Sequence, residues 1–284
     1  MRDDYLLGGD LRVDRVGFGA MRLATNSFRG EARDPETGRA VLRRARELGV
    51  NHVDTAAFYA SRDGSVRSNA LIREALHPYP ADLVIATKVG PTRTPDGELV
   101  EDTDPGALRA QVEENLRGLG VDCLDLVYLR VGAMEPPHGE SVAARFEALA
   151  ALRAEGLIRH LGLSNVDAGH LAEAGAIAPV AAVQNRSHPA ERDDDPLAAV
   201  CEKSGIAFVP FCPLGGGLHD IADEALLAVA RRHGATAAQT ALARLLASSP
   251  AALAIPGTGS LAHLEENTAA RDLALTPEDL AQLA

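Results

Sequence analysis

The sequence predicts a single α/β domain, a (β/α)8 barrel preceded by a β-hairpin. Eight short apolar segments alternate with helix-like segments along the whole chain, which favours a barrel over a doubly wound sheet. The length of 284 residues suits one such barrel, which typically takes about 250 residues. No linker or low-complexity stretch interrupts the pattern, so residues 1–284 are expected to form one domain.

The elements are predicted in order along the chain. Apolar residues flank Gly8-Gly9-Asp10, a compact hairpin signal. The barrel strands are short apolar runs, expected at residues 16–19, in a run that starts at residue 51, and at residues 82–88, 124–129, 158–163, 180–183, 206–211 and 252–255. Two helices have clear N-terminal caps, at Asp104-Pro105 and at Thr276-Pro277-Glu278. Helices are expected at residues 35–48, 68–76, 105–119, 141–154, 168–174, 196–204, 236–246, 261–270 and 276–283.

The charge of the chain limits its partners. The formal net charge is −12, which argues against nucleic acid or an anionic membrane, because both bind a basic face. Any anionic ligand must therefore be held by local donors rather than by the overall field. The sequence does not indicate an oligomeric state.

The cysteines and the N-terminus indicate a cytoplasmic protein. Cys123, Cys201 and Cys212 form no CxxC pair and no His-rich cluster, which predicts reduced thiols and no metal site. The first residues lack the apolar core of a signal peptide, and no run is long enough to span a bilayer.

Two strand ends carry the polar groups that are candidates for catalysis. The stretch from Asn51 to Tyr59 begins like a buried strand and ends in an acid, a bend of small residues and a phenol. The next strand ends in Lys88. Because successive barrel strands end at the same rim, Asp54, Tyr59 and Lys88 are expected to meet.

Lys88 is unusual in this composition. Lys and Arg together number 28, and only Lys88 and Lys203 are lysines, so 26 (28 minus 2) are arginines. A lysine after an apolar strand can share or perturb a proton, which a guanidinium cannot. For Lys88 taken alone, an ordinary ion pair with Asp54 is an equally good interpretation.

Asp54, Tyr59 and Lys88, together with the motifs around them, resemble the aldo-keto reductase family. The resemblance runs nearly from end to end, and its motifs occur in the family's order. It implies a barrel whose bottom the N-terminal hairpin closes, and reduction of a small-molecule carbonyl substrate by NADPH. The other motifs are Gly17-Phe-Gly-Ala-Met-Arg22, Gly162-Leu-Ser-Asn165, Val183-Gln-Asn185 and Ile255-Pro-Gly-Thr258.

The resemblance implies that Tyr59 is a general acid. A free phenol has a pKa of ~10 and donates poorly near neutrality. Lys88 is expected to lower the pKa of Tyr59, and Asp54 is expected to hold and orient Lys88. The alternative for Tyr59 is an amphipathic loop tyrosine with no role.

The fourth catalytic position departs from the family pattern. Most members end the fourth strand in a histidine, whereas this strand ends in Arg130. An arginine stays protonated, so it is expected to orient the substrate oxygen and stabilise negative charge. The alternative is a rim arginine paired with a loop carboxylate such as Glu135. His138 is a weaker stand-in for the missing histidine.

The resemblance also implies the residues that bind the cofactor. Ser164, Asn165 and Gln184 are expected to bond the nicotinamide carboxamide, and Phe211 to stack on the nicotinamide ring. Glycines in the first strand and after Phe211 would admit a ligand close to the backbone, although they can equally serve packing. The remaining cofactor candidates in these two regions are Gly19, Met21, Pro213, Leu214, Gly215 and Gly216.

A second cofactor region is expected near the C-terminus. The small, hydroxyl-bearing loop Gly257-Thr-Gly-Ser260 precedes a helix, whose N-terminus attracts anions. The resemblance implies that this loop, with Ile255 and Thr258, holds the 2′-phosphate of NADPH, and that Glu266 and Asn267 lie near the adenine. His263 is the nearest basic residue in the sequence, so NADH is not excluded. A capped helix without a ligand is the alternative.

The substrate is less defined than the cofactor. The strand ending in Arg130, the glycine loop and the C-terminal motif look most like the bacterial branch that includes pyridoxal reductases (pyridoxine 4-dehydrogenases), which implies a pyridoxal-like substrate. Loops 61–67, 131–139 and 186–192, which contain several arginines and His188, are expected to shape the substrate pocket.

Two other functions remain open at this point. One is an NADPH-binding regulatory module with weak or no turnover, for which Arg130 would mark the lost catalysis. The other is a biosynthetic enzyme that uses the same site for double-bond reduction or dehydration.

Overall fold

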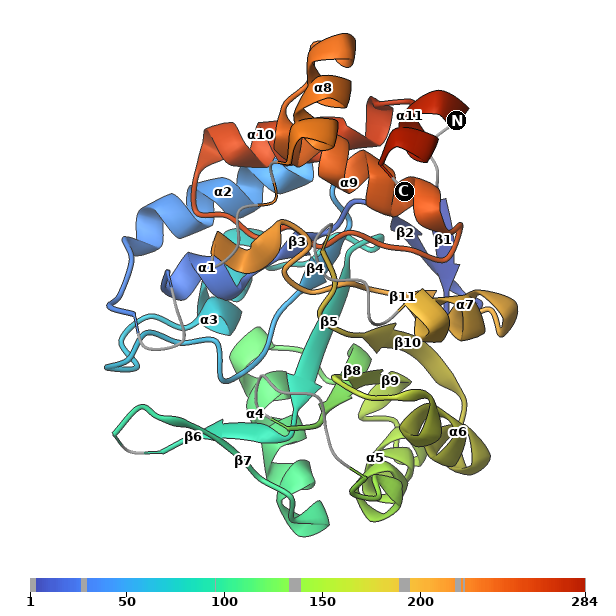
Figure 1. The fold of residues 1–284 in the computed structure, drawn as a ribbon. Coiled ribbons are helices and arrows are strands. Elements are labelled where there is room, and N and C mark those ends of the chain that lie inside the picture. Colours follow the sequence, from blue (N-terminus) through green and yellow to red (C-terminus); the bar gives the residue numbers. More distant parts are fainter. Residues whose placement is uncertain are drawn as a thin grey trace.

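Parallel strands curve into a barrel in the computed structural model, which describes residues 4–26, 30–94, 96–132, 139–188, 195–217, 221 and 223–283 (Figure 1). The main sheet has seven strands in the order β11-β10-β9-β8-β5-β4-β3. They are β3 (Phe18–Gly19), β4 (His52–Asp54), β5 (Val84–Val89), β8 (Leu124–Arg130), β9 (Ile158–Ser164), β10 (Val180–Gln184) and β11 (Ala207–Phe208).

An eighth segment closes the barrel. Ala252 forms a parallel bridge with Phe208 of β11, and Ala254 forms one with Val16, just before β3. Backbone hydrogen bonds accompany both bridges. The Leu253 amide donates to the Phe208 carbonyl at 2.9 Å, and the Gly17 amide donates to the Ala254 carbonyl at 2.7 Å. The predicted (β/α)8 barrel is confirmed, with its eighth strand reduced to single bridges.

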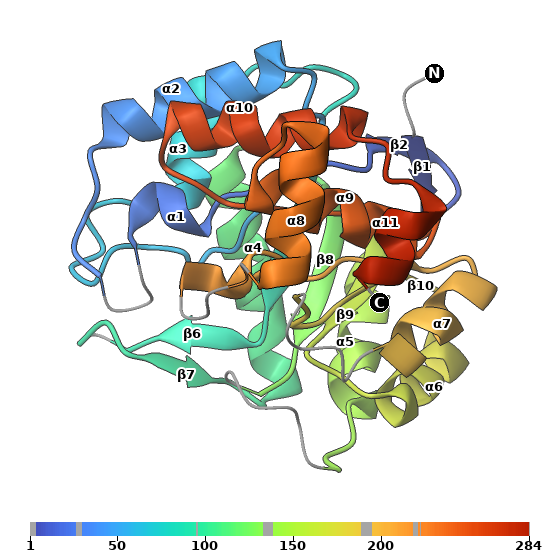
Figure 2. The same ribbon diagram turned by 45° about the horizontal axis from the view of Figure 1, so that its top comes forward.

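Helices surround the sheet, and α2 and α10 lie side by side on one side of the barrel (Figure 2). Most begin and end within a few residues of the prediction. They are α2 (Pro35–Glu47), α3 (Ser68–Leu76), α4 (Leu108–Leu119), α5 (Ala143–Ala154), α6 (Ala168–Ile177), α7 (Asp195–Lys203), α9 (Ala237–Ser248), α10 (Leu261–Ala269) and α11 (Pro277–Gln282).

Among the described residues, two α-helices and one β-hairpin were not predicted. A short helix α1 (Met21–Ala24) follows β3, the antiparallel hairpin of β6 (Pro91–Arg93) and β7 (Leu99–Glu101) follows β5, and α8 (Glu224–His233) precedes α9. The hairpin extends from the end of β5 (Figures 1 and 2). All three are insertions into the repeating plan of one helix for each strand, so the periodic pattern of the barrel did not reveal them.

The strand predicted at residues 206–211 is wrong in its second half. Ladder pairing covers only Ala207–Phe208, and Phe211 keeps a single parallel bridge to Arg186. Pro210 and Pro213 have no amide hydrogen to donate to a ladder. The regular ladder therefore ends early, although the Val209 and Phe211 amides still donate to the Val183 and Asn185 carbonyls at 2.8 Å.

Side-chain alternation divides the core into two layers. Alternate residues of β5 and β8, such as Val84 and Leu126, fill the barrel interior, whereas Ile85 and Val127 pack against the outer helices. Because successive strand residues face opposite sides, Lys88 is the last residue of β5 that faces the barrel interior. By the same alternation, the last interior-facing residues are Asp54 in β4 and Arg130 in β8.

The N-terminal hairpin plugs the interior from below, as expected. It consists of β1 (Asp4–Leu7) and β2 (Leu11–Asp14), which pair antiparallel. Leu7, Leu11 and Val13 belong to the same buried cluster as the barrel interior. The Tyr5 hydroxyl donates to the Gly205 carbonyl at 3.0 Å, just ahead of β11.

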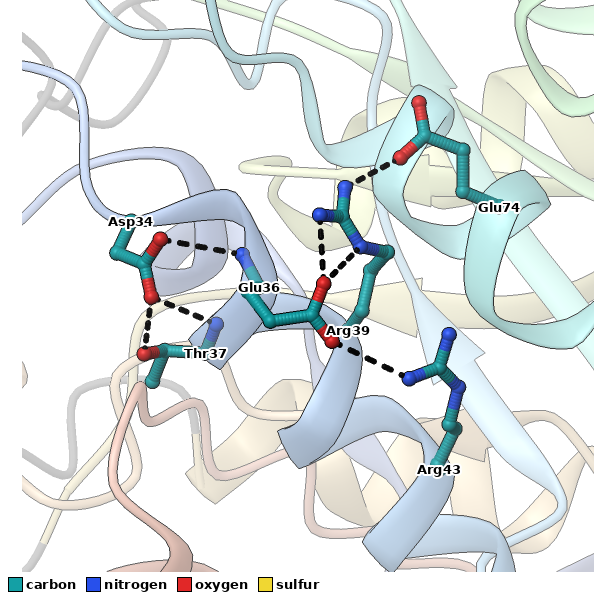
Figure 3. A network of polar contacts seen from close by, with 6 residues as sticks. All are labelled: Asp34, Glu36, Thr37, Arg39, Arg43 and Glu74. Carbon is teal, nitrogen blue, oxygen red and sulfur yellow. Dashed lines mark hydrogen bonds and ion pairs between the residues drawn. The ribbon is translucent and has the colours of Figure 1, made fainter.

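Helix α2 shows how local sequence sets a helix start (Figure 3). Asp34 accepts bonds from the amides of Glu36 and Thr37, and Pro35 fills the first turn. A surface network continues from Glu36 to α3 through Arg39. Its members are Asp34, Glu36, Thr37, Arg39, Arg43 and Glu74.

The two helix caps that the sequence predicted are present. Asp104 accepts from the Gly106 amide at the start of a 3-10 turn, Pro105–Ala107, that leads into α4. Thr276 caps α11 and forms a capping box with Asp279. Within the described residues, no helix combines the length and the apolar character that crossing a bilayer requires.

His52 lies fully buried inside the barrel, and neither of its ring nitrogens has a hydrogen-bond partner among the described residues. Burial lowers the pKa of His52 to about 4. As pH falls from about 6.5 to about 4, the unfolded chain takes up a proton at this position and the native chain does not. The native state should therefore lose roughly 3 kcal/mol of stability over that range through His52 alone.

Denaturant unfolding measured between pH 7 and pH 4 tests this expectation. A His52→Gln variant should show a smaller fall in unfolding free energy than the wild type. The exposed His263 provides the control, because His263→Gln should keep the wild-type slope. Equal slopes for wild type and His52→Gln would contradict a neutral buried His52.

Candidate active site

A buried ion pair joins the ends of β4 and β5. The Lys88 Nζ lies 2.5 Å from Asp54 Oδ1, and it also donates to the Thr55 carbonyl at 3.1 Å. Each residue is only 3% exposed. The parallel pairing of β4 with β5, which sets Asp54 beside Ala86, brings the two side chains to one rim.

Tyr59 completes this cluster. Its ring centroid lies 4.8 Å from the Lys88 Nζ. Tyr59 follows β4 in a short turn, in which its amide donates to the Ala56 carbonyl. The three residues predicted to meet do so.

The pKa of Tyr59 is raised above its ordinary value, contrary to the sequence-based expectation that it is lowered. Burial of the phenol is the largest cause, and the charges of Lys88 and Arg130 offset it only in part. For Lys88, burial lowers the pKa, but Asp54 and Tyr59 outweigh it and leave the pKa raised. At neutral pH the site therefore holds a protonated phenol beside an ammonium.

Gln184 at the end of β10 fixes the other oxygen of Asp54. Its Nε2 donates to Asp54 Oδ2 at 2.8 Å, and the side chain is fully buried. Both carboxylate oxygens of Asp54 are thus engaged. The predicted role of Gln184 toward nicotinamide remains a prediction, because its amide nitrogen serves Asp54 in this structure.

Arg130 lies at the end of β8, within the same rim. Its Nη1 donates to Ser164 Oγ at 3.2 Å, and its guanidinium lies 4.7 Å from the centre of the Phe211 ring. Burial lowers its pKa to about 10, so it stays charged at neutral pH. Glu135 and His138, the alternatives considered from the sequence, lie outside the described residues.

A network behind the barrel wall supports the strand ends. Thr55 Oγ1 donates to Asn69 Oδ1 at 2.8 Å, and Thr87 Oγ1 donates to Asn115 Oδ1 at 2.6 Å. Asn69 in turn donates to Asn115 at 3.0 Å, which connects α3 to α4. Thr55 and Thr87 adjoin Asp54 and Lys88 in the chain, so these bonds fix the ends of β4 and β5 from outside the barrel. The sequence analysis missed this network.

The glycines of the first strand serve packing. A Cβ on Gly19 would lie 2.7 Å from the Ile255 carbonyl, and one on Gly257 would lie 2.5 Å from the Gly19 carbonyl. The two segments pass so closely that neither tolerates a side chain. A ligand contact at these positions remains a prediction.

The other cofactor candidates lie at or near this rim. Asn165, with a φ of 60°, donates to the Val131 carbonyl at 2.8 Å. Leu214 packs into the core next to a tight turn, Gly215–Gly217, so its side chain is structural. Met21 lies in α1. Four other candidates are buried, and Glu266 is partly buried; the buried ones are Pro213, Ile255, Thr258 and Asn267.

The C-terminal loop ends where predicted. Ser260 caps α10 through the His263 amide, and the Ser260 amide donates to Thr258 Oγ1 at 3.0 Å. His263 itself is exposed. The loop therefore has the helix N-terminus that an anion site requires.

An arginine that the sequence analysis did not identify contacts this loop. The Arg33 Nη2 donates to the Gly259 carbonyl at 3.2 Å. A second arginine, Arg22, donates to the Gly216 carbonyl. Arg22 belongs to one of the quoted motifs, but no local signal marked Arg33, because 226 residues separate it from Gly259.

The loops expected to shape the substrate pocket are described in part. Residues 133–138 and 189–194 lie outside the described residues. In loop 61–67, Arg62 and Arg67 line a cavity of about 410 Å³ that also reaches Lys88 and Arg93. No group of three or more His, Cys, Asp or Glu side chains suited to a metal ion occurs in the described parts of the chain.

Comparison with known proteins identifies a single family. The model of the aldo/keto reductase family matches residues 15–284. Pyridoxine 4-dehydrogenase of Escherichia coli strain K12 is 45% identical over 277 residues, covering 97% of this chain and 95% of that protein.

Solved structures show the same fold. A crystal structure of an aldo/keto reductase from Klebsiella pneumoniae with NADP and acetate has a TM-score of 0.83 at 27% identity, and it covers 100% of this chain and 94% of that chain. Another Klebsiella pneumoniae aldo-keto reductase, in complex with NADPH, has a TM-score of 0.79 at 26% identity, with the same coverage of 100% and 94%.

Removing one partner of the buried pair should destabilise the fold. Lys88→Met leaves the Asp54 carboxylate buried without its counter-ion, which should cost about 3–5 kcal/mol. Restoring neutrality with Asp54→Asn in the same chain should recover much of that loss. Urea unfolding of the single and double variants measures both effects.

The exposed pair of Arg109 and Glu155 supplies the control, because Arg109→Met should change the unfolding free energy little. Similar losses for Lys88→Met and Arg109→Met would show that the Lys88–Asp54 pair is energetically unimportant.

Proposed function

The chain belongs to the aldo/keto reductase family, and we propose that it reduces an aldehyde or ketone to an alcohol with NADPH, with Tyr59 as general acid. One observation carries the proposal. Asp54, Lys88 and Tyr59 meet at the barrel rim as an ion-paired ammonium in contact with a phenol.

Each residue has a distinct role in this proposal. NADPH supplies the hydride when bound. Tyr59, protonated at neutral pH because its pKa is raised, gives its proton to the carbonyl oxygen as negative charge develops there. Lys88 stabilises the resulting phenolate, and Asp54 with Gln184 keeps Lys88 in place. Arg130 donates hydrogen bonds to the same substrate oxygen but keeps its proton.

The rim fits an anionic dinucleotide in spite of the net charge of −12. Arg22 at the Gly216 turn and Arg33 at the Gly259 loop place two guanidinium groups beside the segments expected to hold phosphates. Ser164 accepts a bond from Arg130, which leaves its own hydroxyl proton available to a carboxamide. We expect Ser164, Asn165 and Phe211 to hold the nicotinamide.

Pyridoxal is the substrate to test first. The relative that is 45% identical is named a pyridoxine 4-dehydrogenase, and Arg130 can bond an aldehyde oxygen and a ring hydroxyl together through its fork of donors. Oxidation of pyridoxine with NADP⁺ is the reverse of the same reaction. If NADPH binds tightly but no aldehyde is reduced, a regulatory binding module replaces the enzyme.

Tyr59→Phe tests the assignment of the acid. Turnover should fall by roughly 10²–10⁴-fold, whereas NADPH should bind as before, because only a hydroxyl is lost. Stopped-flow absorbance of reduced nicotinamide measures turnover, and fluorescence titration measures binding. Tyr79→Phe is the matched control, since the Tyr79 hydroxyl donates to the Leu119 carbonyl, away from the site. Undiminished turnover of Tyr59→Phe would remove Tyr59 from the mechanism.

Arg33→Ala tests the phosphate end of the site. Loss of one charge-assisted contact should weaken NADPH binding by about 10-fold or more and leave NADH binding unchanged, because NADH lacks the 2′-phosphate. Arg43→Ala, an exposed arginine on α2, should alter neither affinity. Equal weakening of both cofactors by Arg33→Ala would move Arg33 away from the 2′-phosphate.

A further inference from the structure

The hairpin of β6 and β7 brings one guanidinium to the back of the turn that carries Tyr59. Arg93, the last residue of β6, donates from Nε to the Phe58 carbonyl at 2.9 Å and from Nη2 to the Ala60 carbonyl at 2.9 Å. Its Nη1 donates to the Gly97 carbonyl at 2.6 Å. One side chain therefore bonds the residues on both sides of Tyr59 and ties them to the hairpin turn.

Backbone hydrogen bonds also hold the turn around Tyr59: the Tyr59 amide donates to the Ala56 carbonyl and the Ala60 amide to the Phe58 carbonyl, each at 3.0 Å. The turn lies outside the sheet ladder, between β4 and α3. The Tyr59 carbonyl accepts from the Ser68 amide at 2.9 Å, and Ala60 forms an isolated antiparallel bridge with Arg67. The direction of the phenol over Lys88 therefore depends on how the peptides on either side of Tyr59 are oriented. Arg93 holds the carbonyl groups of Phe58 and Ala60.

The chemistry of this contact requires arginine. A planar guanidinium has five N–H donors in a fixed fork, so it can hold several carbonyl groups in one geometry. An ammonium is a compact charge on a flexible stem and reproduces that geometry poorly. Arg93 is partly buried, and burial, together with the charge of Arg67, lowers its pKa.

The hairpin turn is itself fitted to the catalytic loop. Gly97 has a φ of 80°, and a Cβ at this position would lie 2.5 Å from the Arg62 carbonyl. Only glycine allows the turn to lie this close to the loop after Tyr59. The hairpin is thus docked on that loop by backbone packing as well as by Arg93.

We propose that Arg93 is a positioning residue, which holds the Tyr59 hydroxyl in its reactive place by clamping the carbonyl groups of Phe58 and Ala60. This proposal rests on the proposed role of Tyr59 as the acid. Arg93 does not touch the reacting atoms. It acts through the backbone, so its loss should affect the rate of proton donation rather than the binding of NADPH.

The cavity of about 410 Å³ makes a decisive experiment possible. Arg93, Arg67 and Arg62 all line it, as do Phe58 and Gln111. Truncation of Arg93 would enlarge this space and leave it open to small ions. An added guanidinium compound can then enter and restore the missing hydrogen bonds, which a globally damaged fold would not permit.

The first comparison is Arg93→Ala against Arg109→Ala. Arg109 is exposed, and its side chain pairs with Glu155 instead of holding the turn. Arg93→Ala should lower kcat by about 10²-fold, the order expected for a misplacement of about 1 Å, and leave the NADPH affinity as in the wild type. Ethylguanidinium at millimolar concentration should restore much of the kcat of Arg93→Ala and have no effect on Arg109→Ala.

Arg93→Lys guards against a folding defect in Arg93→Ala. It should lower kcat at a thermal midpoint near that of the wild type, because the lysine stem keeps most of the packing of Arg93. Equal kcat values for Arg93→Lys, Arg109→Ala and the wild type would overturn the clamp. So would a loss of kcat in Arg93→Ala that ethylguanidinium does not restore.

A double variant separates this proposal from the proposed function. In the Tyr59→Phe background, Arg93→Ala should cause no further loss, because the group that Arg93 positions is already gone. Full turnover of Tyr59→Phe overturns the acid assignment and, with it, the clamp. An inactive Tyr59→Phe combined with an unimpaired Arg93→Ala overturns the clamp alone.

Discussion

The site depends on the buried ion pair between Asp54 and Lys88. Two charges that are 97% removed from solvent would be costly if either stood alone. Here the ammonium bonds one carboxylate oxygen and the Thr55 carbonyl, and Gln184 bonds the other carboxylate oxygen. The barrel can keep an ammonium beside a partly buried phenol only because this set of partners is complete.

Burial has opposite consequences for the groups around this pair. It raises the pKa of Tyr59 and lowers that of Arg130, and it keeps His52, lower in the barrel, neutral. The apolar interior therefore favours a protonated phenol at rest. The positive charges nearby favour the phenolate that forms once the proton has left. In the proposed role of Tyr59 as the acid, burial keeps the proton on the phenol before the reaction, and the nearby positive charges stabilise the phenolate after it.

The positive charge of the rim is local. A chain with a net charge of −12 nevertheless places Arg22, Arg33 and Arg130 beside the segments that we propose to bind the dinucleotide and the carbonyl compound. Arg22 donates to the Gly216 carbonyl and Arg33 to the Gly259 carbonyl. Because these acceptors are neutral, they do not cancel the charge of either guanidinium.

The sequence by itself determined the repeating part of the protein. Three kinds of feature are local signals that can be recognised without coordinates: alternating strands and helices, capping residues such as Asp104 and Thr276, and the strand-end positions of Asp54 and Lys88. The tertiary structure decided the contacts between distant segments: the closure of the barrel at Ala252 and Ala254, Arg33 at Gly259, and Arg93 across the carbonyl groups beside Tyr59. It also decided the sign of the change in the Tyr59 pKa, because the balance between burial and a neighbouring ammonium depends on packing that no local pattern encodes.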